Sequence, residues 1–342
     1  KGFSRALKAL TGFGDGTWRN GGLKAQKSPT MSAQCPKAKD APTAPDVDTC
    51  AHCGIKSGGE GGKVKLKMCT ACRLVKYCSV DCQKAHRKGH KKACKERAAE
   101  LRDERLFNQG SERTEEDFCP ICFIPYPVQL DSESVFRDCC LKVVCTGCSL
   151  AALERKSMDC PFCRTPPGEE GSLERIRGRA EKGDPEAMAA LASGYFYGRY
   201  DLTVDKHLSF KWWKDAADLG HKLSQFNVGR AYSQGDGVPM DMKVAIHYWE
   251  EAAMSGCPRS RHQLAMLDGI AGRTDRALRH LLISCKLGFK ESMDMIRQLH
   301  KDGSVTREQC KSALVDYLNA QDEVSSPLRI RATMMDRKRS TS

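Results

Sequence analysis

The segment CSVDCQKAHRKGHKKAC (residues 78–94) places a cysteine or histidine at every fourth position, at 78, 82, 86, 90 and 94. Because an α-helix returns to nearly the same face after four residues, these side chains would lie on one side of a helix. The pattern predicts either a helix that presents metal ligands on one face or a basic helix with unrelated thiols. The other cysteines of the chain decide between the two.

The composition favours metal binding. The chain has 342 residues and 19 cysteines, of which sixteen lie at or before residue 163, mostly in Cys-x-x-Cys pairs. No apolar run approaches the roughly 18 residues of a transmembrane helix, and residues 1–45 lack the apolar core of a secretory signal. Without such a signal, paired cysteines favour metal sites over disulfides. We therefore expect an intracellular zinc protein, cytoplasmic or nuclear, with no membrane partner.

The first cysteine cluster, residues 50–94, supplies eight candidate ligands, enough for two tetrahedral zinc ions. They are Cys50, Cys53, Cys69, Cys72, Cys78, Cys82, His90 and Cys94. A spacing of four on a helix lets His90 and Cys94 share a metal. His86 lies on the same helical face, and we interpret it as a surface or supporting histidine. An exchange of roles between His86 and His90 is the alternative.

The spacing of these ligands resembles the MYND zinc finger, whose second half is matched by YCSVDCQ (77–83) and HKKAC (90–94). The resemblance implies an interleaved arrangement, with one zinc held by Cys50, Cys53, Cys78 and Cys82 and the other by Cys69, Cys72, His90 and Cys94. It also implies a protein-binding module that takes short, often proline-containing peptides. Arg87 stands where the family usually has tryptophan, so the peptide groove is expected to differ.

The second cysteine cluster, residues 119–164, opens with CPIC (119–122) and closes with CPFCR (160–164), and both motifs resemble the RING finger. The resemblance implies a cross-brace with two zincs, but Lys142 stands at the family's histidine position and cannot bind zinc while protonated. Cys139 brings the number of candidate zinc ligands in this cluster back to eight. One zinc would take Cys119, Cys122, Cys145 and Cys148, and the other would take Cys139, Cys140, Cys160 and Cys163. The alternative for the latter is three thiolates without Cys139, completed by water or another ligand.

A RING finger implies a ubiquitin ligase that has no catalytic nucleophile and orients a charged ubiquitin-conjugating enzyme for reaction. Three positions match the family's contact surface: Ile121 as the apolar contact, Pro161 in the second loop, and Arg164, whose rigid fork of donors suits a bridge to ubiquitin. In the alternative, Ile121 only packs the finger, Arg164 is solvated and the finger is structural. A methyltransferase, in which MYND fingers also occur, is disfavoured because no segment is left for a methyl-donor domain.

The C-terminal half is repetitive. Glycines close successive units at 220, 256 and 288, a period typical of helical solenoids. The stretches KWWKDAADLG (211–220) and SQGDGVPMD (233–241) resemble the Sel1-like repeat, a relative of the tetratricopeptide repeat. The resemblance implies paired helices that bury their aromatic residues and present an extended surface to another protein or peptide.

These segments predict two small zinc-stabilised fingers, MYND-like and RING-like, followed by an all-α solenoid. The expected boundaries are a disordered basic segment at 1–47, the two fingers at 50–94 and 119–164, a charged helix and linker at 95–117, a hinge at 165–171, repeats with a C-terminal cap at 172–322, and a disordered basic tail at 323–342. This order of modules resembles predicted proteins of diatoms and related algae.

The formal net charge of +13 overstates the attraction for polyanions. Three four-thiolate zinc sites of net −2 and one site of net −1 would lower it to about +6. Specific nucleic-acid binding is not expected, because no aromatic residues interleave with the lysines of 84–95. Two hypotheses remain: a zinc-dependent ubiquitin ligase that recruits its substrate through the MYND-like finger and the repeats, or a non-enzymatic adaptor.

Overall fold

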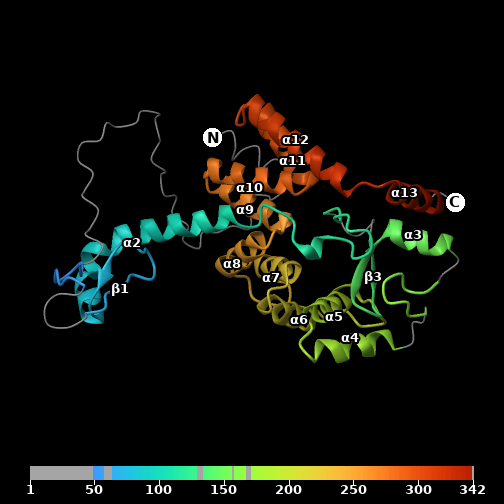
Figure 1. Cartoon of the computed structure of the whole chain (residues 1–342), viewed down its shortest axis with the longest axis horizontal. Coiled ribbons are helices and arrows are strands. Elements are labelled where there is room, and N and C mark those ends of the chain that lie inside the picture. The colour runs from blue at the N-terminus through green and yellow to red at the C-terminus, as the bar shows by residue number, and fades with distance from the viewer. Residues whose placement is uncertain (1–48, 58–63, 129–133, 156–157, 167–170, 341–342) are drawn as a thin grey trace. The chain divides into compact units, whose positions relative to one another are not determined.

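The computed structural model describes residues 49–57, 64–128, 134–155, 158–166 and 171–340 (Figure 1). The expected disordered segment 1–47 and most of the expected hinge lie outside these ranges. The described residues divide into two compact units, one that ends at residue 108 and one that begins at residue 109. Among the described residues, no helix combines the length and apolar character needed to cross a membrane.

The first unit is a small finger followed by one long helix. Strands β1 (Lys67–Met68) and β2 (Lys76–Tyr77) pair antiparallel. Helix α2 (Val80–Asn108) starts where Ser79 Oγ accepts a hydrogen bond from the Cys82 N–H at 3.2 Å. The buried core consists of Cys50, Cys69, Cys72 and Tyr77. Because three of these four side chains are thiols, apolar burial alone contributes little, and the finger depends on what the thiols bind.

The second unit begins with another finger. It contains a 3-10 turn, η1 (Glu115–Asp117), the antiparallel strands β3 (Ser134–Arg137) and β4 (Lys142–Cys145), and helix α3 (Thr146–Glu154). Its own core is again built partly of thiols, with Cys119 and Cys145 packed beside Tyr126 and Val144. The Tyr126 hydroxyl donates to the Val143 carbonyl at 2.5 Å, so this core also ties the first loop to β4.

The rest of the second unit is a helical-repeat region, as expected from the sequence. Its helices follow one another in order from α4 to α12 (Figure 1). They are α4 (Ser172–Ala180), α5 (Pro185–Tyr197), α6 (Lys206–Asp218), α7 (Lys222–Gln234), α8 (Met242–Met254), α9 (Pro258–Ile270), α10 (Thr274–Lys286), α11 (Lys290–Lys301) and α12 (Arg307–Val324). The pairs α5–α6, α7–α8 and α9–α10 make the most extensive contacts. Aspartates at 184, 205 and 241 cap the N-termini of α5, α6 and α8 through their side chains.

Small residues bring the paired helices close together. Gly229 of α7 lies against the indole of Trp249 on α8, and a Cβ there would lie 2.5 Å from Trp249 Nε1. The indole N–H in turn donates to the Phe226 carbonyl at 3.2 Å. Trp213, Ala216 and Ala217 of α6 are buried in the same way as Trp249, Ala252 and Ala253 of α8. The burial of aromatic residues between paired helices, which the Sel1-like resemblance implies, is therefore seen at both tryptophans.

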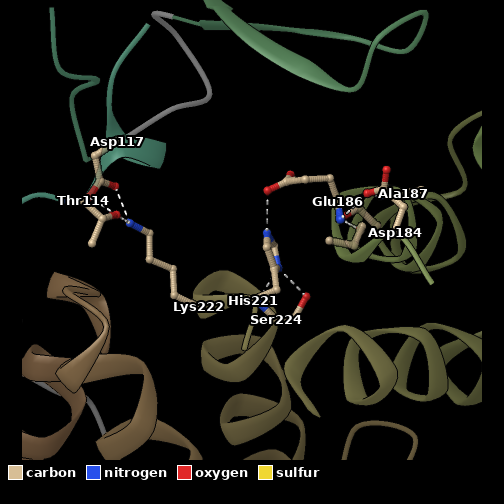
Figure 2. A network of polar contacts seen from close by, with 10 residues as sticks. Thr114, Asp117, Asp184, Glu186, Ala187, His221, Lys222 and Ser224 are labelled. Atoms are coloured by element: carbon tan, nitrogen blue, oxygen red, sulfur yellow. Dashed lines mark hydrogen bonds and ion pairs between the residues drawn. The ribbon is translucent and has the colours of Figure 1, made fainter. Parts of the chain in front are cut away.

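The second finger packs directly against the repeats. Leu141, between β3 and β4, belongs to the same buried cluster as Ile176 of α4 and Leu191 of α5. Figure 2 shows Lys222 at the start of α7 reaching back to the finger, where its Nζ lies 2.6 Å from Asp117 Oδ1 and 2.9 Å from Thr114 Oγ1. The finger and the solenoid therefore share one core rather than being joined by a hinge alone.

Arginine side chains extend this contact. Arg113 donates to the carbonyls of Tyr126 at 2.9 Å and Leu287 at 3.4 Å. The fully buried Arg261 of α9 donates to the Gln109 carbonyl at 2.5 Å. Each guanidinium satisfies backbone oxygens that folding removes from water, so the segment entering the second finger is fixed to the repeats.

The expectation of a disordered basic tail at 323–342 is wrong for most of its length, because helix α13 (Pro327–Ser340) occupies it. Ser326 Oγ accepts from the Arg329 N–H at 3.3 Å, and Pro327 fills the first helical position. Helix α13 packs against α3 of the second finger. Arg329, only 2 % exposed, donates to the Pro125 carbonyl at 2.5 Å and to the Ile124 carbonyl at 2.9 Å. The buried arginine explains the order of this basic segment.

Candidate metal centres

Four Cys-x-x-Cys turns share one backbone geometry. In each turn, the residue after the second cysteine donates its N–H to the carbonyl of the first cysteine, at 2.8 to 3.0 Å. That residue has a positive φ, between 55° and 74°, and only one of the four is a glycine: the residues are Gly54, Arg73, Phe123 and Arg164. The tight turn brings both thiols to one side of the backbone, where they can meet a common ion.

The first finger gathers the predicted ligands into two groups. Cys50, Cys53, Cys78 and Cys82 form one, in which Cys78 Sγ lies 3.5 Å from both Cys53 Sγ and Cys82 Sγ. Cys69, Cys72, His90 and Cys94 form the other. The two groups alternate along the chain, which is the interleaving that the MYND resemblance implies.

His90, rather than His86, lies among the thiols. Its Nε2 is 3.1 Å from Cys72 Sγ. His86 stacks on the His90 ring at 5.5 Å between centroids, and its Nδ1 is 3.1 Å from the Tyr77 hydroxyl. Burial is the main cause that lowers the pKa of His90, and the nearby His86 lowers it further. A lowered pKa favours the neutral imidazole, which is the form that binds metal. His86 therefore has the geometry of a supporting residue.

The second finger also gathers two groups of four thiols. Cys119, Cys122, Cys145 and Cys148 form the first, with Cys119 and Cys148 sulfurs 3.9 Å apart and Cys122 and Cys145 sulfurs 3.8 Å apart. Cys145 also caps α3, since its Sγ accepts from the Cys148 N–H. This N–H opposes, but does not outweigh, the contact with Cys119 and the burial that raise the pKa of Cys145.

Cys139, Cys140, Cys160 and Cys163 form the last group, so the adjacent pair Cys139 and Cys140 converges on one centre. The chain can do this because it turns sharply there: the Cys140 N–H donates to the Arg137 carbonyl, and Leu141 has a φ of 56°. Cys139 Sγ lies 3.4 Å from Cys163 Sγ, and Cys140 Sγ lies 3.9 Å from Cys160 Sγ. The geometry thus includes Cys139, in accordance with the eight-sulfur reading.

The spacing of the sulfurs fits zinc and not disulfides. In a tetrahedral site with Zn–S bonds of about 2.3 Å, neighbouring sulfurs lie about 3.8 Å apart, whereas a disulfide holds them at about 2.05 Å. The measured separations across the four groups run from 3.4 to 3.9 Å. All described cysteines are free. Sets of four thiolates, or three with an imidazole, are the donors that zinc prefers.

The ionisation of the thiols points the same way. A hydrogen bond from the Cys145 thiol is the main factor that lowers the pKa of Cys119 to about 4, and the same contact raises the pKa of Cys145. The Thr165 hydroxyl lowers the pKa of Cys163 to about 6, whereas burial raises that of Cys139. In each of these two groups, the pKa of one thiol is therefore lowered while that of a neighbouring thiol is raised. A divalent cation removes this conflict because it favours the thiolate at every ligand.

The predicted partner contacts of the second finger lie at its surface to different degrees. Ile121 is 37 % exposed, Arg164 is exposed and Pro161 is half-buried. Phe123, which follows Cys122 with a positive φ, is 75 % exposed. Arg329 backs this loop from the other side, with Nη2 3.9 Å from Cys122 Sγ. Sequence reasoning missed Arg329, although the Ser326–Pro327 helix start was a usable signal for its helix.

Comparison with known proteins identifies two of the modules. The MYND finger family model matches residues 50–94, and the Sel1 repeat model matches residues 185–221 and 222–257. The chain contains a MYND finger and Sel1 repeats. The MYND finger implies zinc binding, and both modules generally mediate protein–protein interaction. The two Sel1 matches end at His221 and Cys257, each directly after a closing glycine.

Three curated relatives are regulators of an enzyme. The chain is 26 % identical over 137 residues to chitin synthase regulatory factor 4 of Schizosaccharomyces pombe, covering 40 % of this chain and 22 % of that protein. It is 33 % identical over 91 residues to chitin synthase regulator SKT5 of Saccharomyces cerevisiae, covering 26 % and 13 %. Chitin synthase regulatory factor 2 of Schizosaccharomyces pombe is 29 % identical over 91 residues, covering 27 % and 18 %. The chain spans less than a quarter of each relative.

Two solved structures are similar to part of the chain. A protective antigen of uropathogenic Escherichia coli displaying an SLR fold is 24 % identical, with a TM-score of 0.39, over 45 % of this chain and 33 % of that one. A Sel1 repeat protein from Oxalobacter formigenes is 31 % identical, with a TM-score of 0.29, over 33 % of this chain and 82 % of that one.

Proposed function

We propose that this protein is a non-catalytic adaptor whose Sel1 repeats hold a partner protein along the edge formed by their intra-repeat turns. The observation behind this proposal is a row of exposed apolar side chains at successive turns. Val204 precedes α6 and is 62 % exposed, Met240 precedes α8 and is 60 % exposed, and Ile270 ends α9 and is 48 % exposed. Val204 and Met240 occupy equivalent places, each two residues before the second helix of its pair, and Ile270 lies at the corresponding turn of the next pair. Apolar side chains exposed at each of these turns are expected of a binding surface.

The two turns that carry Val204 and Met240 are neighbours in space. Lys206 Nζ at the start of α6 lies 2.7 Å from Asp236 Oδ1 in the α7–α8 turn, and Gly237 of the same turn packs on the Lys206 carbonyl. The rim beside the apolar row is therefore polar, as in many protein interfaces. The second finger shares the core of the repeats, so the finger and the edge would reach a partner as one rigid body.

The relatives support an adaptor. The curated proteins are named as regulators of chitin synthase, so each acts on another protein. We infer that the partner of the present chain is likewise an enzyme or an assembly that the adaptor regulates, and that the MYND finger recruits a second protein.

Affinity purification from the source cells tests this proposal with two variants of the full chain. Val204→Ser combined with Met240→Ser and Ile270→Ser alters the apolar edge, and Cys69→Ser combined with Cys72→Ser removes two MYND ligands. An adaptor loses one set of partners in the first variant and a different set in the second. Partner lists that are identical for the wild type and both variants would rule out a bridging role.

We also propose that the chain holds four zinc ions, two in each finger. The support is the four groups of ligand atoms, each lying within 4.8 Å of one another. Metal analysis of the purified protein should give four zincs per chain. A value of three that does not fall further in Cys139→Ser would show that the Cys139 site is the vacant one.

Ubiquitin transfer is the second candidate function of the chain, favoured by one observation at the second finger. Arg164 is exposed directly after the last ligand, where a RING-type ligase places its bridging arginine, and Ile121 is also exposed. Autoubiquitination with a panel of conjugating enzymes separates the two functions. Activity that is lost in both Arg164→Ala and Ile121→Ala would establish a ligase, and no activity with any enzyme would leave the adaptor.

A further inference from the structure

The first half of α2 carries an unusual concentration of positive charge. Six basic side chains lie between residues 84 and 95, and all six are exposed: Lys84, Arg87, Lys88, Lys91, Lys92 and Lys95. None of them forms an ion pair with another described residue. We call this set the α2 basic stripe.

The six side chains lie on one side of the helix. At about 100° per residue, they fall within an arc of about 140° centred near Lys95, and they span about 16 Å of helix length. Cys82, His86, His90 and Cys94 lie on the opposite side, toward the metal centres. The zinc-binding face therefore fixes the helix while the basic stripe points to solvent.

The arrangement is unfavourable for the finger alone. Like charges follow one another at i, i+3 and i, i+4 all along the stripe, for example Lys84 with Lys88 and Lys88 with Lys92, and such pairs destabilise a helix. Residues 49–95 hold 12 Lys and Arg against 2 Asp and Glu. Two zinc sites of net −2 and −1 would still leave about +7. Within the described ranges no acidic side chain pairs with the stripe, so its charges are available to an external polyanion.

We propose that the α2 basic stripe binds the phosphodiester backbone of duplex nucleic acid without reading its sequence. Lysine supplies five of the six charges, and lysine is depleted in protein interfaces but serves well as a point charge for phosphates. A straight helix with cations along one side can follow a phosphate backbone. No aromatic residue interrupts the stripe, so base stacking and sequence readout are not part of the contact. This inference goes beyond the adaptor function and does not depend on it.

Salt-dependent binding of the zinc-loaded full chain tests the proposal. The probes are a labelled 20-base-pair DNA duplex, the RNA duplex of the same sequence, and poly-L-glutamate as an acidic protein mimic. The test variant replaces Lys88, Lys91 and Lys95 with Gln, which preserves helix propensity. The matched control replaces three exposed lysines of the repeats, Lys211, Lys243 and Lys311, with Gln, so both variants lose three charges. Zinc content and far-UV circular dichroism establish that each variant is folded.

For the wild type, the slope of log affinity against log salt should approach about −5 if all six cations contact phosphates. The stripe variant should bind at least about 10-fold more weakly at 0.1 M salt and lose between two and three units of slope. The control should bind like the wild type. Comparison of the affinities for the DNA and RNA duplexes identifies which of the two the stripe binds. Equal losses in both variants, no binding of either duplex, or tighter binding of poly-L-glutamate than of both duplexes would overturn the proposal.

Discussion

Replacing Gly229 with alanine should destabilise the repeats, even though alanine is the better helix former. The new Cβ would lie 2.5 Å from Trp249 Nε1 and 3.1 Å from the Ala245 carbonyl, so the indole must move and release its hydrogen bond to Phe226. Overpacking costs about 1–3 kcal/mol, and the lost hydrogen bond costs about 1 kcal/mol. The gain in helix propensity returns up to about 1 kcal/mol. The net loss is about 2 kcal/mol, or about 4–8 °C in melting temperature for a unit of this size.

Gly178 of α4 provides the matched control, because a Cβ there meets nothing within 4 Å. Gly178→Ala should therefore stabilise the same unit, by up to about 1 kcal/mol. Thermal and urea unfolding, followed by circular dichroism at 222 nm with zinc present, measures both variants. Opposite signs for the two alanines support close helix packing as the cause. A Gly229→Ala protein that melts at or above the wild-type temperature would refute it.

Three further changes have defined outcomes. Arg329→Met leaves the Ile124 and Pro125 carbonyls without their buried donor, so hydrogen exchange at 122–126 should rise by roughly 10-fold or more. Burial lowers the pKa of His262 to about 4, below the value of about 6.5 expected in the unfolded chain. The free energy of unfolding should therefore be highest above pH 6.5 and fall by about 3 kcal/mol as the pH drops toward 4. An unfolding free energy in urea that is the same at pH 7 and pH 4.5 would contradict this. Gly89 has open space at its Cβ, so Gly89→Ala should raise the melting temperature of the MYND unit without changing its zinc content.

The grouping of the candidate zinc ligands was predictable because their spacing carries most of the information. A Cys-x-x-Cys turn closes on itself, so two thiols three residues apart share a side. The sequence left His86 and His90 as alternatives, and the structure places His90 Nε2 beside Cys72. The helix pairs were predictable for a similar reason, since the small and aromatic residues around Trp213 and Trp249 recur at a fixed period. Both signals are local or periodic.

The contacts between the second finger and the repeats were not predictable, because they join residues far apart in sequence. Lys222 meets Asp117 across 105 positions, and Arg329 meets Pro125 across 204. A lysine after a closing glycine and an arginine in a basic tail look like solvated surface charges. Only the fold shows that each satisfies groups in a finger formed much earlier in the chain.

Because Arg329 of helix α13 binds the first ligand loop of the second finger, the folding of that finger depends on the order of synthesis. Its first ligand loop leaves the ribosome about 200 residues before Arg329, which at 5–20 residues per second is a delay of roughly 10–40 s. During that interval the loop carrying Cys122 has no covering helix, and its thiols are open to zinc, to competing metals and to oxidants. Metal supply at the moment of translation should therefore influence how much of the protein acquires a correctly loaded second finger.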